Sequence, residues 1–181
     1  KIYIETKLGE LEQDAKTYLE FNRQTNIRWK KSFQTFLDAK VFKYKKGIIS
    51  RGNERFFLME VSGMYLFEKG MKNKKMKEIM FESAFSVGQE IFMDMGGKDI
   101  HGIMELLSAL GFGELSIYFP SGQMKVIITH FPWTKYYKEI DYLFIRGLLS
   151  GIFSHIYKKN FCFKKPKIDI LSGNLSLIFE H

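Results

Sequence analysis

The stretch DYLFIRGLLSGIFSHIY, residues 141–157, decides the fold. Its apolar residues recur at the three- and four-residue intervals of an α-helix, whereas small and polar residues fill the opposite side. We therefore predict one amphipathic helix with two chemically different faces. The apolar face carries Tyr142, Ile145, Leu148, Leu149, Ile152, Phe153 and Ile156, and the lean face carries Arg146, Gly147, Ser150, Gly151 and Ser154.

Gly147 and Gly151 are one helical turn apart on the lean face. Each glycine costs a helix about 1 kcal/mol relative to alanine, so close packing is expected at both positions. The lean face could contact a partner or a ligand, or it could pack on a neighbouring strand of the same domain. A membrane span is excluded because Arg146 and His155 interrupt an apolar run that is shorter than about 20 residues.

The composition favours one domain whose interior consists of bulky aromatic and flexible methionine side chains. Aromatic residues make up 16% of the 181 residues, and nine methionines add flexible apolar side chains. Such an interior can be solidly packed or can line a cavity for an apolar ligand. The single cysteine, Cys162, excludes an intramolecular disulfide and suits a reducing cytoplasm, which is the predicted localisation. No signal peptide or membrane-spanning segment is expected.

Basic charge is concentrated near the N-terminus. The net charge is +8, and residues 1–46 hold eleven lysines and arginines against six acidic residues. Helical patterns over residues 8–22 and 29–41 predict that residues 1–50 form an arm. This arm could dimerise, connect to an output domain or fold onto the main domain, and its charge permits DNA contact. A linker is predicted at 43–47, with the domain boundary near Ser50.

Hydrophobic periodicity predicts an α+β domain over residues 51–181. Extended chain is expected at 55–61, a turn or short helix at 63–70, and helices at 73–95 and 100–110. The period then changes to two, which predicts hairpins formed by 115–119 with 124–130 and by 167–171 with 174–179, and a short strand at 161–163. Several helices would pack with a mainly antiparallel sheet of two hairpins.

Catalytic signatures are missing, so an enzyme is the least favoured class. The sequence has no GxSxG, HExxH, Walker A, GxGxxG or CxxC motif, and no pair of its four histidines has close ligand spacing. We predict no catalytic residue and no metal. His130 is the best pocket candidate, because it ends a predicted strand beside Phe131 and Trp133, where a polar group could orient a mostly apolar ligand.

Three stretches together carry a resemblance to a known family: FESAFSVGQEI at 81–91, LLSALGFGELSIYF at 106–119 and FIRGLLSGIFSHI at 144–156. With Gly173 and Phe179 in the final hairpin, their order and spacing resemble the 4-vinyl reductase domain from about Arg55 onward. This family is similar to the small TRAPP vesicle-tethering subunits and to the haem nitric-oxide-binding domains. The resemblance implies a small-molecule-binding module, often hydrophobic in preference, frequently dimeric and used as a sensor in regulatory proteins.

The resemblance also bears on cofactors. Many domains of this family carry cysteines that bind a structural zinc, and the matching places here are around Tyr142, Asp169 and Leu177. Since these places hold no cysteine, the zinc site is expected to be lost. Nothing matches the haem-ligand motif of the nitric-oxide sensors, so no cofactor is predicted.

The function predicted on this basis is ligand sensing as part of a regulatory protein, such as a regulator of transcription. The pocket is expected between the helices at 73–95 and 141–157, closed by the loop 131–137, and ligand binding would alter dimer geometry or an output partner. The alternative is a non-catalytic TRAPP-like interaction module that uses its apolar faces for dimerisation. The candidate lining residues are Phe81, Phe85, Gly88, His130, Trp133, Tyr137, Phe144 and Leu148.

Overall fold

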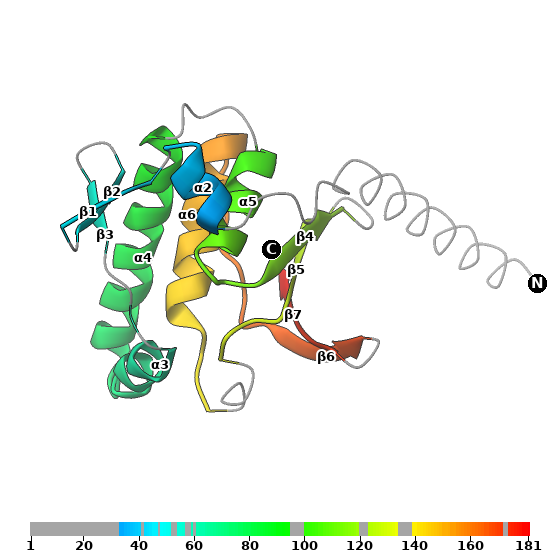
Figure 1. The fold of residues 1–181 in the computed structure, drawn as a ribbon. Helices are drawn as coiled ribbons and strands as arrows, with labels where there is room; N and C mark the ends of the chain where they lie inside the picture. Colours follow the sequence, from blue (N-terminus) through cyan, green and yellow to red (C-terminus); the bar gives the residue numbers. More distant parts are fainter. Residues whose placement is uncertain are drawn as a thin grey trace, which may run out of the picture.

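The structure, a computed structural model, describes residues 33–40, 42–46, 48–51, 54–56, 59, 61–94, 100–119, 123–133, 139–171 and 174–181. In this part of the chain, helices combine with a three-stranded and a four-stranded antiparallel sheet (Figure 1). The predicted α+β class is confirmed. The elements are, in order, α2 (Phe33–Asp38), β1 (Lys43–Lys45), β2 (Ile48–Arg51), β3 (Glu54–Phe56), α3 (Val61–Lys69), α4 (Lys74–Asp94), α5 (Ile100–Ala109), β4 (Glu114–Tyr118), β5 (Lys125–Thr129), α6 (Leu143–Tyr157), β6 (Lys167–Leu171) and β7 (Asn174–Glu180).

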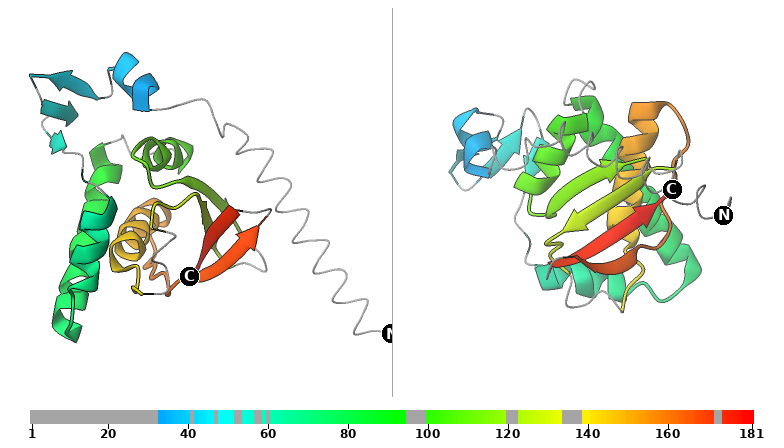
Figure 2. Two further views of the ribbon diagram at one scale, coloured as in Figure 1. Left: turned by 60° about the horizontal axis from the view of Figure 1, so that its bottom comes forward. Right: turned by 90° about the vertical axis from the view of Figure 1, so that its right-hand side faces the viewer.

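Helix α6 is the central element of the domain. Figure 1 and Figure 2 show it between α4 on one side and the four-stranded sheet on the other. Its apolar face packs on the sheet, where Ile145, Leu148 and Ile152 join one buried cluster with the strand residues Val126 and Phe179. Burial of each such side chain contributes about 1.5–3 kcal/mol, so the sheet contact fixes which face of α6 points inward.

The four-stranded sheet has the order β4-β5-β7-β6, so the two predicted hairpins are joined along β5 and β7. Ile117 lies opposite Val126, and Val126 lies opposite Phe179. Because side chains alternate between the two faces of a strand, this register places the apolar residues of three strands toward α6. The ends of α4, α5 and α6 differ from the predicted ends by at most two residues.

The lean face of α6 meets α4 through glycine. A Cβ atom on Gly147 would lie 2.4 Å from the carbonyl oxygen of Phe81, and one on Gly151 would lie 2.0 Å from the carbonyl oxygen of Phe85. Side-chain carbon cannot occupy either place, so the backbones of the two helices touch here. Contacts of this kind require small residues and favour Cα–H···O=C interactions between helices.

Helix α4 provides the reciprocal contact. A Cβ atom on Gly88 would lie 2.3 Å from the carbonyl oxygen of Leu148. The sequence left open whether the lean face meets a ligand, a partner or a strand, and the structure places a helix of the same chain against both of its glycines. We call this backbone contact of Gly88, Gly147 and Gly151 the glycine crossing.

The polar residues of the lean face hold the segment 161–163. The backbone N–H of Phe161 donates to Ser154 Oγ at 2.8 Å, and that of Phe163 donates to Ser150 Oγ at 3.0 Å. The guanidinium Nε of Arg146 donates to the Phe163 carbonyl at 2.9 Å. The short strand predicted at 161–163 is therefore wrong, because α6 side chains take the hydrogen bonds that a neighbouring strand would use.

The small sheet β1-β2-β3 replaces a predicted linker. Residues 43–45 form β1 and pair with β2, so the linker prediction is wrong for this segment, and the boundary predicted near Ser50 falls inside β2. Phe42 is buried against Leu106 of α5. Leu37, Ile49 and Phe56 also pack on this contact, so the described part of the predicted arm lies on the main domain. The helical pattern at 8–22 lies outside the described residues.

The segment before α4 is more helical than predicted. Extended structure was expected over 55–61, but β3 ends at Phe56 and α3 begins at Val61. The short helix expected over 63–70 corresponds to α3. It places Tyr65 and Glu68, three residues apart, on one buried side of the helix, and this side reaches the start of α6.

The glycine crossing can be tested with two alanine substitutions in helices. Gly151→Ala should lower the free energy of unfolding by about 1–3 kcal/mol, because the new methyl group overlaps the Phe85 carbonyl. Gly63→Ala is the matched control, since a Cβ there meets only the Met59 side chain at 3.5 Å. That control should be neutral or stabilise α3 by up to about 1 kcal/mol. Chemical denaturation measures both, and equal effects would contradict the crossing.

Candidate ligand-binding site

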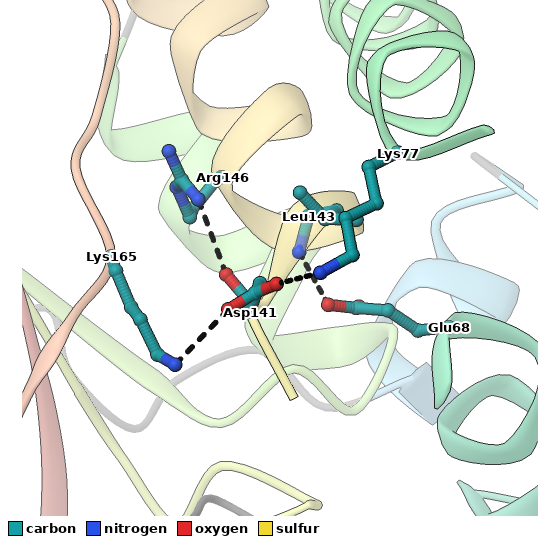
Figure 3. Close-up of polar contacts among 6 residues, drawn as sticks. All are labelled: Glu68, Lys77, Asp141, Leu143, Arg146 and Lys165. Atoms are coloured by element: carbon teal, nitrogen blue, oxygen red, sulfur yellow. Dashed lines mark hydrogen bonds and ion pairs between the residues drawn. The ribbon is translucent and has the colours of Figure 1, made fainter. Parts of the chain in front are cut away.

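Helix α6 begins with an unusual cap supplied by another helix. Tyr142 precedes the helix in the left-handed conformation, with φ 57°, and its side chain makes no capping hydrogen bond. The N–H groups of a first helical turn need acceptors from elsewhere. Glu68 of α3 provides one, because its Oε1 accepts a hydrogen bond from the backbone N–H of Leu143 at 2.6 Å (Figure 3).

The Glu68 carboxyl is buried, with 3% of the residue exposed. Burial raises its pKa, and the backbone N–H groups of Leu143 and Phe144 oppose that effect by stabilising the ionised form. The nearby charge of Asp141 raises the pKa further, and that of Arg146 lowers it. The second carboxyl oxygen, Oε2, is likewise shielded from solvent.

Asp141 ties three segments together beside this cap. Its carboxylate accepts from Lys77 of α4 at 2.6 Å and from Lys165, which precedes β6, at 3.0 Å (Figure 3). The hydrogen bond from Lys77 lowers the pKa of the Asp141 carboxyl most, and the hydrogen bond from Lys165 lowers it further. Arg146 Nη1 donates to the Asp141 carbonyl at 3.3 Å, and its guanidinium lies 5.7 Å from the centre of the Phe81 ring. Pairs this exposed contribute little energy, so their role is to orient the segment.

Helix α3 also holds the residues that lead into α6. The Tyr65 hydroxyl donates to the Glu139 carboxylate, and Lys69 Nζ donates to the same carboxylate at 2.5 Å and to Tyr65 at 2.9 Å. The hydrogen bond from Lys69 lowers the pKa of the Glu139 carboxyl most, and the hydrogen bond from Tyr65 lowers it further. Together with Glu68, these contacts fasten α3 to residues 139–143.

Buried aromatic rings pack near the same end of α6. The rings of Phe131 and Trp133 meet edge to face, with centroids 5.1 Å apart, and Phe131 lies 6.0 Å from Tyr142. Phe144 stacks on Phe112 at 6.2 Å. Tyr65 belongs to the same buried cluster as Phe131, Trp133 and Tyr142, so α3 also contributes to this core. The start of α6 thus holds both the Glu68 carboxylate and the rings of Tyr142 and Phe144.

The structure separates the predicted lining residues. Phe81, Phe85, Gly88 and Leu148 all contribute main chain to the glycine crossing, where contact between the helices leaves no room for a ligand. Trp133 and Phe144 lie instead at the start of α6, in or beside the buried cluster. The end of α6 near Glu68, where polar contacts and aromatic rings lie together, is the candidate site.

Two other predicted residues do not join this group. His130 directly follows β5, about half of its side chain is exposed, and its Nε2 lies 3.8 Å from Glu114 Oε1, so it lies at the protein surface. Tyr137 lies outside the described residues. Sequence reasoning missed Glu68 and Tyr65. The sequence signal that could have found them is their spacing. Glu68 follows Tyr65 by three residues in a short helix, so it lies on the side of the helix where an apolar residue is expected.

The described residues contain no group of three His, Cys, Asp or Glu side chains arranged to hold a metal ion. At the places matching the family's zinc ligands, Tyr142 and Leu177 are buried and Asp169 is exposed on β6. Within the same ranges, no helix is both long enough and apolar enough to cross a bilayer.

Comparisons with known proteins point to a fold rather than a sequence family. No protein-family model and no curated protein matches the sequence. The structure is similar to the phenol-responsive sensory domain of the transcription activator PoxR, solved with phenol, at a TM-score of 0.54 and 11% identity. The alignment covers 84% of this chain and 91% of that chain. The two chains share a fold.

A vinyl-4-reductase family protein from Methanocaldococcus jannaschii is also similar, over 68% of this chain and 95% of that chain. Its identity is 17% and its TM-score is 0.41. At these identities the likeness concerns the fold alone, so the binding chemistry has to be argued from the residues of this chain.

Proposed function

We propose that this chain is a sensor domain that binds a small, mostly apolar molecule beside the start of α6. The observation that carries the proposal is the buried Glu68 carboxylate at the end of α6 where the rings of Tyr142 and Phe131 also pack. A few polar groups set into an apolar wall are typical of small-molecule sites. The shared fold supports the proposal, since the similar PoxR domain is phenol-responsive.

The contacts of α3 supply a route from the ligand to the rest of the chain. This helix holds residues 139–143 through Tyr65, Glu68 and Lys69. It follows the small sheet, which packs on α5. A ligand that favours one position of α3 would shift the N-terminal region and so act on an output partner, such as the remainder of a transcription regulator or DNA. The basic N-terminal residues would make that contact.

Ligand binding should be detectable by native mass spectrometry and by a rise in melting temperature. Native mass spectrometry of freshly purified protein reports any molecule carried over. A panel of apolar aromatic compounds should then raise the melting temperature, because a ligand at about 100 times its Kd stabilises the folded state by about 2.7 kcal/mol. The variant Trp29→Phe leaves Trp133 as the single tryptophan, so its fluorescence reports binding at this end of α6. A panel that changes neither signal would contradict the proposal.

A second function, self-association, is favoured by an exposed apolar stripe on α4. Ile79 is 53% exposed and Val87 is 41% exposed, and each lies four residues from the exposed Ser83. Lys75 and Glu90 flank the stripe at its two ends. Two copies of α4 packed antiparallel about Ser83 would bring Ile79 of one copy to Val87 of the other and Lys75 toward Glu90. We propose a second copy of this chain as the occupant, because the pattern is complementary to itself.

A charge placed in the stripe should dissociate this dimer. Ile79→Glu is expected to shift sedimentation from dimer to monomer, since a buried glutamate would be unpaired at the two-fold contact. Ile170→Glu is the matched control, because Ile170 is 70% exposed on the edge strand β6 and lies outside the stripe. A wild-type monomer, or a dimer that survives Ile79→Glu, would rule out this surface.

A further inference from the structure

Helix α3 carries large apolar side chains on its solvent side. Leu66 is 61% exposed and Phe67 is 57% exposed, whereas Glu68 on the opposite side of the helix is buried. Met59 extends this apolar face: it is 51% exposed, and its side chain lies 3.5 Å from the place that a Cβ atom on Gly63 would take. Exposed apolar residues that occur singly are common, but a group of them on one helical face marks an interaction surface.

Positive charge follows this apolar face directly in the chain. Residues 66–77 contain five lysines and one acidic residue, Glu68, which is buried. Two of the lysines pair with carboxylates, Lys69 with Glu139 and Lys77 with Asp141. The other three lysines are exposed, and we call them together with the two exposed residues of α3 the α3–α4 corner: Leu66, Phe67, Lys72, Lys74 and Lys75.

The local fold places the two parts of the corner side by side. Only residues 70–73 separate the two helices, and Figure 1 shows α3 at the end of α4, away from the four-stranded sheet. Asn73 caps α4, since its Oδ1 accepts from the backbone N–H of Met76 at 2.8 Å. The first turn of α4 holds no acidic residue, so Lys74 and Lys75 add to the positive end of the helix dipole. An anionic partner would offset this unfavourable arrangement.

We propose that the α3–α4 corner docks on the surface of an anionic lipid bilayer. Leu66 and Phe67 would enter the boundary between headgroups and acyl chains, and the three lysines would contact the negatively charged headgroups. A nucleic-acid backbone would also attract the lysines, but it would leave both apolar side chains in water. The combination of apolar and basic side chains on one surface therefore favours lipid.

Docking is compatible with the contacts that α3 makes inside the domain, because the two use opposite sides of the helix. Glu68 accepts from the backbone N–H of Leu143, and Tyr65 donates to Glu139, on the buried side. Leu66 and Phe67 are on the exposed side and take no part in these contacts. Substitutions of the exposed residues should therefore change docking without unfolding α3 or the start of α6.

Vesicle co-sedimentation tests the apolar part of the surface. We expect the protein to bind vesicles of phosphatidylcholine mixed equally with phosphatidylglycerol at least about tenfold more tightly than vesicles of phosphatidylcholine alone, and less tightly as salt is added. Phe67→Ser should weaken binding to the mixed vesicles at least about tenfold. Ile170→Ser is the matched control, because Ile170 is 70% exposed on β6, outside the corner, and should leave binding unchanged.

A charge reversal tests the basic part. Lys72→Glu should weaken binding to the mixed vesicles at least about fivefold, since each lysine near an anionic surface contributes by about that factor. Lys159→Glu has the same change in net charge and is the control, because Lys159 is an exposed residue just beyond the other end of α6. It should have a smaller effect. Circular dichroism establishes that all four variants are folded.

A fluorescent label locates the contact. Cys162 is the single cysteine, so Cys162→Ser allows an environment-sensitive dye to be attached through Leu66→Cys or, as the control, Ile170→Cys. The dye at position 66 should shift to shorter wavelength with mixed vesicles, and the dye at position 170 should not.

Several results would overturn the proposal: no binding to mixed vesicles, equal binding to neutral ones, equal losses in test and control variants, or retention on DNA without vesicle binding. The sensor function stands in each case, because the compound panel tests it separately.

Discussion

The backbone contact between α4 and α6 is the constraint on which the rest of the structure depends. Gly147 and Gly151 face the carbonyl oxygens of Phe81 and Phe85, and Gly88 faces α6 in return. A pair of helices this close cannot slide without steric overlap, because each glycine lies against main chain rather than against a side chain that could rotate. With α4 on one side and the sheet on the other, α6 is fixed in both position and rotation.

The glycine crossing also limits where a binding site can lie. It fills the space between the two helices along its length, so the proposed site is at an end of α6 rather than alongside it. At the end near Leu143, the first turn is capped from α3, and Asp141 connects to α4 and to the segment before β6. A buried acid, a network of ion pairs and aromatic rings thus meet where the central helix begins.

Much of the fold could be predicted from periodicity. The helix at 141–157 and both hairpins were expected because their apolar patterns are long and regular, and the two glycines indicated a close approach. The residue that the site depends on could not be identified this way. Glu68 is 75 residues from Leu143 in the sequence, and only the packing of α3 brings them together. The segment 161–163 was misread for a similar reason, since its hydrogen bonds go to serines of α6.

The most direct measurement of the central claim is a proton–proton contact in solution. Nuclear Overhauser spectroscopy on labelled protein should show a strong cross-peak between the Hα protons of Gly151 and the Hα proton of Phe85, because a Cβ placed on Gly151 would lie 3.1 Å from the Phe85 Cα atom. A spectrum with both resonances assigned and this cross-peak absent would show that the helices do not touch, and the placement of the ligand site at the start of α6 would lose its basis.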